Sequence, residues 1–370
     1  MAQTILTPAK MIIGPGSLAE LGTGVATLGR RALLATGRKA LREAGTTNRI
    51  VETLEAAGVD TVLFENVEPE PSCTTCDRAR TVISEEHCDV VLGAGGGSVM
   101  DAAKVAAGLA REDVPTVEFW NGRQPERPGL PFVAVPTTSG TGAEATKNGV
   151  LTNPEVPAKK SIRDDAFVAA LVVLDAELTL SCPPKVTAYS GMDALVQAIE
   201  SFTSVHANAV TDAWSFQAVR LLKTSVLAAY RDGSDLGARS DAACGSLLAG
   251  LALANARLGM VHGLAHPLGA RYHIPHGLVC AVLLPPVMRF NREAAAEKYA
   301  RLDHVMEGDA AAFVETLLTQ LDIPSDLKQF NINPDDVPRL VEESLPSGSL
   351  KANPRKATSE ACTAVLNHVI

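Results

Sequence analysis

The apolar pattern of this 370-residue chain changes character near its middle. Up to about residue 175, short apolar runs that suit β-strands alternate with helical stretches of roughly 10 to 15 residues. This alternation predicts a parallel α/β sheet covered on both faces. From Thr187 onward strand patterns fade, and alanine- and leucine-rich segments with helical periodicity follow one another. We therefore expect an N-terminal α/β domain over residues 1–182 and an all-helical domain over residues 183–370.

The expected elements follow from periodicity and from residues typical of helix ends. In the first half, strands are expected at 4–6, 10–13, 31–37, 61–64, 90–92, 131–135 and 169–173, and helices from about Ser17, at 45–58 and at 74–86. Ser17 is expected to be an N-cap, with Glu20 at the third helical position. In the second half, helices are expected at 187–203, 208–230, 236–256, 259–266, 277–290, 293–305, 308–321, 335–344 and 358–368.

Charge and composition exclude several classes of protein. The net charge is −9 and the pI about 5.4, so we expect no nucleic-acid partner and no anionic membrane surface. The N-terminal decapeptide lacks an apolar segment, and no apolar run reaches the roughly 18 to 20 residues of a membrane span. The seven cysteines are scattered, and the CxxC of Cys73 and Cys76, placed in a turn before a helix, has no second pair. Reduced thiols in a cytoplasmic protein are therefore favoured over a zinc ribbon or a redox motif.

Two strands of the first half run into turns that suit a phosphate. The strand at 90–92 is followed by Gly95, Gly96 and Gly97, and then by a helix. Glycines let backbone N–H groups approach an anion, and a helix N-terminus carries partial positive charge. The motif is neither a P-loop nor a regular GxGxxG, and such a turn can also simply join a strand to a helix. The strand at 131–135 is followed by a similar turn rich in threonine, serine and glycine, which is either a ribose or phosphate contact or a capped helix start.

Histidines are concentrated in one part of the second half. His262 and His266 are four residues apart and would share one face of a helix that Pro267 then interrupts or kinks. His276 follows in a turn, and an earlier helix carries Asp193 and Gln197, again four apart. Such a set is typical of a buried divalent metal site. The alternative is a group of core histidines that bind backbone carbonyls.

These motifs together resemble the iron-containing (group III) alcohol dehydrogenase family, which includes glycerol dehydrogenases and maleylacetate reductases. The resemblance covers nearly the whole chain. It depends on GGGSVMDAAK (95–104), PTTSGTGAE (136–144), GMDAL (191–195), GMVHGLAHPLG (259–269), IPHG (274–277) and NPR (353–355). It implies an N-terminal Rossmann-like parallel α/β domain, a C-terminal helical domain, and an active site in the cleft between them.

The resemblance also implies residue roles. The pyrophosphate of NAD(H) or NADP(H) would be held by Gly95, Gly96, Gly97 and Ser98, with Gly37, Asp101, Thr137, Thr138, Thr146, Lys159 and Val186 lining the rest of the cofactor groove. Lys160 is a competing choice for Lys159. Much of the family has an aspartate after the first nucleotide-domain strand, where this chain has Gly37, Arg38 and Lys39. Loss of the carboxylate that contacts the ribose 2′-OH favours NADP(H), unless both cations only face solvent.

The metal ligands implied by the resemblance are Asp193, His262, His276 and the residue at position 197. The iron enzymes of the family usually have histidine at that position, whereas this chain has Gln197. A neutral amide oxygen is a weaker ligand than imidazole. Three outcomes for the metal site therefore stay open. The site could hold zinc with three protein ligands and water, bind iron weakly, or bind no metal.

The expected reaction is hydride transfer between a small alcohol, or its aldehyde or ketone, and the nicotinamide, assisted by a Lewis-acid metal. His262 and His266 are the catalytic candidates, with His266 orienting substrate or passing the proton. A maleylacetate-reductase-like enzyme without metal would need a cationic side chain to bind its anionic substrate, and Arg257 and Arg271 are the candidates. A dehydroquinate-synthase-like lyase and a non-enzymatic binding protein are more distant alternatives. Members of the family are often dimers, so a homodimer or larger homo-oligomer is expected.

Overall fold

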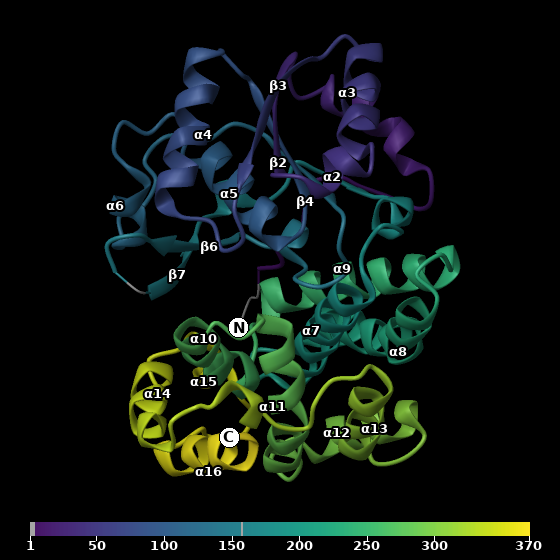
Figure 1. The fold of residues 1–370 in the computed structure, drawn as a ribbon, viewed down its shortest axis with the longest axis vertical. Coiled ribbons are helices and arrows are strands. Elements are labelled where there is room, and N and C mark those ends of the chain that lie inside the picture. Colours follow the sequence, from purple (N-terminus) through teal and green to yellow (C-terminus); the bar gives the residue numbers. More distant parts are fainter. Residues whose placement is uncertain (1–3, 157) are drawn as a thin grey trace. The chain divides into compact units, whose positions relative to one another are not determined.

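The computed structural model describes residues 4–156 and 158–370, which form two compact units. The first unit comprises Leu6–Cys182, and the second contains Pro183–Ile370. Figure 1 follows the chain from the purple strands and helices of the first unit to the green and yellow helices of the second.

The first unit is built on a parallel six-stranded sheet with strand order β1-β8-β5-β4-β2-β3. The strands are β1 (Met11–Ile13), β2 (Arg31–Gly37), β3 (Asp60–Val67), β4 (Val90–Gly95), β5 (Phe132–Pro136) and β8 (Leu171–Leu174). All residues of β4 and β5 are buried. Continuous apolar strands of this kind need cover on both faces, as the alternating sequence pattern predicts.

Helices cover both faces of this sheet. The helices of the unit are α1 (Leu21–Val25), α2 (Ala40–Glu43), α3 (Thr46–Ala56), α4 (Cys73–Glu85), α5 (Gly97–Gly108) and α6 (Thr116–Trp120). Helices α1 and α3 pack their apolar side chains against one face of the central strands. Helices α4 and α5 lie on the opposite face (Figure 1). The fold is therefore the α/β class expected from the sequence.

The chain reverses its direction across the sheet beside β2. It passes from β2 outward to β3 and then returns to the other side of β2 as β4, which continues toward β5. The carboxyl ends of β2 and β4 are adjacent, with Thr36 paired with Ala94. Open α/β sheets bind ligands at such a switch point, so the topology favours a ligand site beside Gly37 and Gly95 at these two strand ends.

A two-stranded antiparallel ribbon was not expected from the sequence. It consists of β6 (Asn148–Asn153) and β7 (Ala158–Arg163), and α5 packs against it. Side chains of β6 alternate between buried and half-buried, but the run is short, polar and followed by Asn153-Pro154. A run of this composition is typical of a loop, and its pairing with β7 and its packing against α5 make it a strand.

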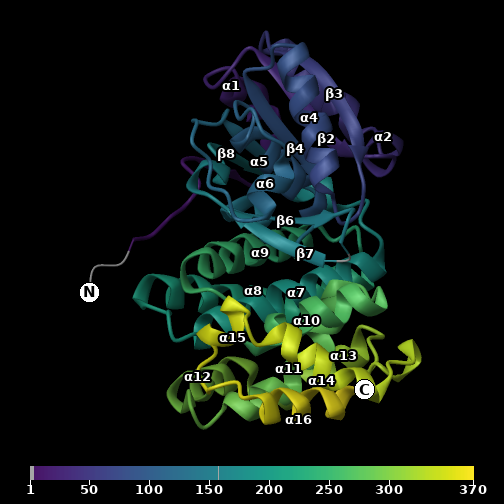
Figure 2. The same cartoon turned by 90° about the vertical axis from the view of Figure 1, so that its left-hand side faces the viewer.

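The second unit is entirely helical over its described residues. Its helices are α7 (Pro184–Thr203), α8 (Ala209–Arg231), α9 (Leu236–Ala256), α10 (Met260–Tyr272), α11 (His276–Asn291), α12 (Ala296–Met306), α13 (Ala310–Gln320), α14 (Val337–Ser344), α15 (Gly348–Ala352) and α16 (Ser359–Val369). The sequence predicted all of these except the short α15. Helix α7 is central, because every residue from Gly191 to Thr203 is buried. Helices α14 and α15 pack on α10, and α16 packs on α11 (Figure 2).

Among the described residues, no single helix has the length and apolarity needed to cross a membrane. Helices α9 and α10 meet those two criteria only when taken as a pair, and they are bent by 102° relative to each other.

The first helical segment begins at Ser17 as expected, but the expected N-cap is wrong, and a distant carboxylate explains why. Ser17 is the first residue of a 3₁₀ helix (Ser17–Glu20), and its hydroxyl has no hydrogen-bond partner among the described residues. The N-cap is Gly16, at φ +77°. Asp175, just after β8, accepts hydrogen bonds from the N–H groups of Gly16 and Leu18 at 3.1 and 3.0 Å. The cap therefore comes from a residue far along the chain, which local sequence cannot reveal.

Other local expectations are also corrected. Residues 4–6 form no strand, and Cys73 and Cys76 lie in the first turn of α4 rather than before it. Helix α10 does not end near Pro267 but continues to Tyr272, because Leu268 on the far side of the proline is buried in the core. His276 is the first residue of α11 and not part of a turn. For α10, the packing of the unit overrides a local signal.

Candidate active site

The glycine turn after β4 forms an open helix N-terminus. Gly96 is the N-cap of α5, and no side chain caps this helix among the described residues. Gly95 has φ +155°, and a Cβ atom there would lie 2.7 Å from Cγ2 of Val99. Only glycine fits this position without strain. The first N–H groups of α5 have no intrahelical partners, so they are available to an anion.

The threonine-rich loop after β5 packs directly on this turn. Thr137 donates its N–H to the carbonyl of Gly95 at 3.0 Å. A Cβ on Gly96 would lie 3.2 Å from Oγ1 of Thr138, and one on Gly97 would lie 2.7 Å from Cγ2 of Thr141. Because β4 and β5 are parallel neighbours, their carboxyl ends meet at one edge of the sheet. The two motifs that the sequence singled out therefore form one surface.

A buried lysine links α5 to the end of the threonine-rich loop. Lys104 is completely buried, and its Nζ donates to the carbonyl of Ala143 and to the carbonyl and hydroxyl of Thr146. Its Nζ also lies 3.7 Å from Oδ1 of Asp101, whose Oδ2 accepts the N–H of Val150 at 3.1 Å. Burial raises the pKa of Asp101 to about 6, although Lys104 opposes the shift. Asp101 and Thr146 are thus brought together, and both are held by Lys104.

The structure distinguishes between the two lysines that compete for one predicted role. Lys159 forms an ion pair with the carboxylate of Glu70, whose N–H donates to the hydroxyl of Ser98 at 3.2 Å. Lys160, on the other face of β7, places its Nζ 3.9 Å from the centre of the Trp120 ring. Lys159 is therefore connected to the glycine turn through Glu70, whereas Lys160 is occupied elsewhere.

Two predicted cofactor positions take no part in the contacts described above. Gly37 ends β2, and the side chains of Arg38 and Lys39 after it are exposed and make no ion pair within the described part of the chain. Val186 is exposed on the first turn of α7, in the helical unit. Its part in cofactor binding stays a prediction.

The helical unit brings the predicted metal ligands together from three helices. Asp193 comes from α7, His262 from α10 and His276 from α11. Oδ1 of Asp193 lies 3.2 Å from Nε2 of His262 and 3.7 Å from Nε2 of His276. Asp193 and His262 are almost fully buried, while the side chain of His276 is 38% exposed. The cluster is therefore accessible from the side of His276.

Gln197 is part of the cluster but turns its nitrogen toward it. Its Nε2 donates to Oδ2 of Asp193 at 3.0 Å, and its Oε1 is buried without a partner among the described residues. The interaction holds one oxygen of Asp193 and leaves Oδ1 facing the two imidazoles.

Glu200 is a member of this site that the sequence reasoning missed. Nδ1 of His262 donates to Oε2 of Glu200 at 2.6 Å, and Oε1 of the same carboxylate accepts the N–H of Val261 at 2.6 Å. The bond orients the imidazole so that Nε2 faces Asp193, an arrangement common for metal-binding histidines. The signal in the sequence was its position, seven residues after Asp193 on the same face of α7.

The charges of the cluster suit a divalent cation. Burial alone would raise the pKa of Asp193, but His276 and the hydrogen bond from His262 keep that pKa below its usual value. The carboxylates of Asp193 and Glu200 are thus buried beside two imidazoles. Carboxylate and imidazole are ligands for zinc and iron, and the three ligand atoms lie close enough to share one ion.

His266 lies beside the cluster rather than inside it. Its ring centre is 6.4 Å from that of His262 and 5.2 Å from that of His276, with the latter pair stacked at 19°. His266 is exposed. It therefore lies at the open side of the site, where a substrate would enter.

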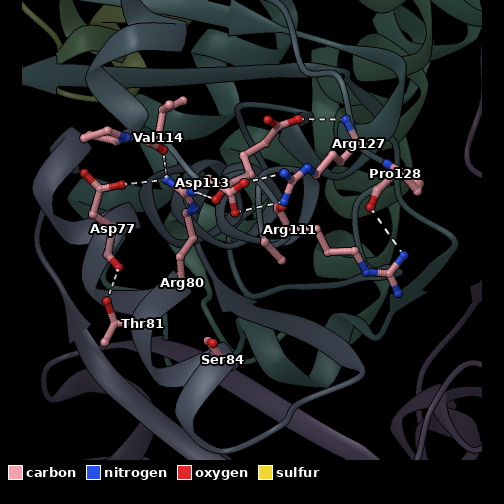
Figure 3. Close-up of a pocket in the computed structure, with 12 residues that line it drawn as sticks. Asp77, Arg80, Thr81, Ser84, Arg111, Asp113, Val114, Arg127 and Pro128 are labelled. Carbon is pink, nitrogen blue, oxygen red and sulfur yellow. Dashed lines mark hydrogen bonds and ion pairs between the residues drawn. The ribbon is translucent and has the colours of Figure 1, made fainter.

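A hollow elsewhere on the α/β unit has no role in this chemistry. It measures about 860 Å³ and is lined by residues of α4 and by the segments after α5 (Figure 3). Its charged groups pair with one another, Arg80 with Asp77 and Arg127 with Asp113. It lies at the end of α5 away from Gly97, which at 1.5 Å per residue is about 18 Å from the glycine turn.

Comparison with known proteins assigns the chain to a family. Residues 8–176 match the model for iron-containing alcohol dehydrogenases, and residues 187–370 match that for the C-terminal part of the same family. The chain belongs to the iron-containing alcohol dehydrogenase family. It is an NAD(P)-dependent oxidoreductase that interconverts an alcohol and its aldehyde or ketone, as the motifs in the sequence implied.

Individual members of the family are similar over their full length. The chain is 36% identical to a 1,3-propanediol dehydrogenase of Citrobacter freundii, over 96% of this chain and 95% of that one. The crystal structure of a 1,3-propanediol oxidoreductase matches with a TM-score of 0.96 at 34% identity, covering all of both chains. A sulfoacetaldehyde reductase from Bifidobacterium kashiwanohense, solved in complex with NAD⁺, matches with a TM-score of 0.91 at 28% identity, covering 100% of this chain and 99% of that one.

Proposed function

We propose that this alcohol dehydrogenase acts on short, uncharged primary alcohols and their aldehydes, with a divalent metal held by Asp193, His262 and His276. The observation that carries the proposal is the convergence of these three side chains from three helices, with Oδ1 of Asp193 within 3.7 Å of both imidazole nitrogens. When bound there, the metal supplies Lewis-acid polarisation of the substrate oxygen. Similarity to the 1,3-propanediol enzymes supports a small alcohol as substrate.

The residues of the chain perform the remaining steps. The N–H groups at the start of α5 and the hydroxyls of Thr137 and Thr138 bind the phosphates and ribose of the cofactor, which places the nicotinamide for hydride transfer. In the helical unit, Glu200 fixes the orientation of His262, and Gln197 fixes that of Asp193. His266, exposed beside His276, orients the substrate hydroxyl or passes its proton to solvent.

A strongly anionic substrate is less well supported. Of the two cations considered for it, Arg271 is paired with Glu343 at 2.7 Å. Arg257 adopts a left-handed backbone at φ +65° and has no ion pair among the described residues. Neither arrangement is a preformed carboxylate site, so uncharged aldehydes are the first substrates to test.

NADP(H) is proposed as an accepted cofactor. The carboxylate that would repel a 2′-phosphate is replaced by Gly37, and the exposed cations Arg38 and Lys39 follow it. The relative solved with NAD⁺ argues that NAD(H) also binds in this family. A cytoplasmic location and a homodimeric assembly stay predictions.

Absorbance at 340 nm tests the proposal with both cofactors. The purified enzyme, loaded in turn with zinc and iron, is offered 1,3-propanediol, ethanol, 1-butanol and their aldehydes, with sulfoacetaldehyde as the anionic comparison. We expect turnover of the uncharged substrates and a kcat/KM for NADP(H) at least equal to that for NAD(H). Turnover of sulfoacetaldehyde alone would overturn the substrate class, and a strong preference for NAD(H) would overturn the role of Arg38 and Lys39.

A further inference from the structure

Cys280 is a member of the histidine cluster that neither the family motifs nor the sequence reasoning include. It follows His276 by four residues on α11, so both side chains lie on one face of that helix. Its Sγ is buried and lies 3.6 Å from Nε2 of His276. The ligand atoms of Asp193, His262, His276 and Cys280 all lie within 4.8 Å of one another.

We propose that the thiolate of Cys280 is the fourth protein ligand of the metal and that Gln197 is not a ligand. The inference rests on the proposed metal site and changes its composition to one carboxylate, two imidazoles and one thiolate. Gln197 is then a positioning residue, because its Nε2 donates to Oδ2 of Asp193, the carboxylate oxygen that does not face the imidazoles.

The distances within the cluster fit a tetrahedral ion. Zinc binds nitrogen at about 2.0 Å and sulfur at about 2.3 Å, so neighbouring ligands of a tetrahedron are about 3.3 Å apart for two nitrogen or oxygen atoms and about 3.5 Å apart for nitrogen and sulfur. The distance from Asp193 to His262 is 3.2 Å, and that from Cys280 to His276 is 3.6 Å. The distance from Asp193 to His276 is 3.7 Å. These three pairs need shifts of only a few tenths of an ångström, and the other three pairs of ligand atoms lie within 4.8 Å of each other.

Gln197 is poorly placed to be the fourth ligand. Its amide nitrogen faces Oδ2 of Asp193, and an amide nitrogen does not bind a metal. Exchanging the amide oxygen and nitrogen would put two acceptor oxygens against each other, because the carboxylate of Asp193 has no proton to donate. The present orientation is therefore the one that hydrogen bonding supports, and it directs Oε1 away from the carboxylate.

The change of ligand has a consequence for the metal. A thiolate is a soft ligand that favours zinc, whereas the histidine usual at position 197 in the iron enzymes of the family is of intermediate character. In this chain the lost imidazole is replaced from a different helix, by α11 instead of α7. We therefore expect zinc to bind more tightly than iron.

Cobalt substitution provides a readout that is independent of activity. Full-length protein is stripped with a chelator and reloaded with Co²⁺, and its absorption spectrum is recorded. A thiolate bound to Co²⁺ gives an intense sulfur-to-metal charge-transfer band in the near ultraviolet, which nitrogen and oxygen ligands do not give. We expect this band in the wild type and in Gln197→Ala, and its complete loss in Cys280→Ala, with at least tenfold weaker Co²⁺ binding in that variant.

The matched control is Cys362→Ala, which removes another fully buried thiol of the helical unit and should keep the band. Stoichiometric Co²⁺ binding without the band in the wild type would overturn the role of Cys280 and leave the metal site intact. Failure of the wild type to bind Co²⁺ or Zn²⁺ would overturn the metal site itself. If Cys280→Ala does not fold, X-ray absorption of the zinc-loaded wild type decides, since one sulfur at about 2.3 Å is expected and a shell of nitrogen and oxygen alone would refute it.

Discussion

The α/β unit and the helical unit build their candidate sites by different means. At the carboxyl edge of the sheet, the candidate binding groups are mainly backbone N–H groups, located where β4 ends at Gly95 and α5 begins at Gly97. In the helical unit, the candidate binding groups are side chains from α7, α10 and α11, of which Asp193 is held by Gln197 and His262 by Glu200. A backbone site can be damaged only by added atoms or strain, whereas a side-chain site can be removed one group at a time.

This difference predicts different sensitivities to substitution. Deleting a side chain from the histidine cluster removes a ligand or leaves a buried charge without its partner, which costs more than its area would indicate. Deletions around the glycine turn should matter less, because the strands and α5 hold the turn in place. The predictions below on activity and binding run from the largest expected effect to the smallest, and a prediction on stability follows them.

The largest effect is expected for His262→Ala. The change removes one ligand atom and leaves the carboxylate of Glu200 buried without its imidazole. Loss of the metal removes several kcal/mol of transition-state stabilisation, which corresponds to a fall in kcat of at least about 100-fold. Metal content and steady-state kinetics measure it. His368→Ala, an exposed histidine on α16, is the control and should change neither. Unchanged turnover in His262→Ala would refute the site.

Glu200→Gln should have the next largest effect. The glutamine keeps an acceptor for Nδ1 of His262 but loses the charge that makes the imidazole a stronger ligand. Such partners of metal-binding histidines are worth about 10- to 100-fold in metal affinity. Competition with a chromophoric chelator measures the affinity, with exposed Glu342→Gln as the control. An affinity equal to that of the wild type would show that Glu200 only satisfies the N–H of Val261.

Gly95→Ala tests the backbone side of the comparison. The added Cβ would lie 2.7 Å from Val99 at a φ of +155°, so the turn must shift. We expect cofactor affinity to fall about tenfold, or roughly 1.4 kcal/mol, with metal content unchanged. Titration of nicotinamide fluorescence measures the affinity. Gly308→Ala, where a Cβ would meet nothing within 4 Å, should leave it unchanged. Full cofactor affinity in Gly95→Ala would show that another surface holds the pyrophosphate.

The last prediction concerns stability instead of function, and the expected effect of Asp101→Asn depends on pH. The pKa of Asp101 is raised by burial to about 6, above its unfolded value near 4. Between these values the folded protein retains a proton that the unfolded chain has lost, so the wild type loses stability as the pH rises through this range. Asparagine does not titrate, so the stability of the variant relative to the wild type should improve from pH 4 to pH 6 by at most about 3 kcal/mol.

Urea unfolding of the cofactor-free protein at several pH values measures this difference. Exposed Asp241→Asn is the control and should show a pH-independent difference from the wild type. A difference between Asp101→Asn and the wild type that does not change between pH 4 and pH 6 would show that Lys104 keeps Asp101 ionised.

Much of the fold could be predicted because periodicity is a local property. Apart from the end of α10, the apolar strands and the predicted helices of the second half were expected within a few residues of where they lie. Two of the misses share one cause, which is that a distant partner decides a local outcome. Asp175 caps the helix that Ser17 was expected to cap, and pairing with β7 and packing against α5 make the polar segment at 148–153 a strand.

The sequence alone determined which faces of α7 and α10 carry polar groups, since residues four apart on a helix share a face whatever surrounds them. The resemblance of the motifs to those of a known family implied the family and its chemistry, and the family models confirmed the family. Only the tertiary structure decided that Glu200 holds His262, that Gln197 turns its nitrogen toward Asp193, and that Cys280 joins the cluster. Those outcomes depend on how three helices pack, and the direction of a buried side chain is set by its neighbours rather than by its own position in the chain.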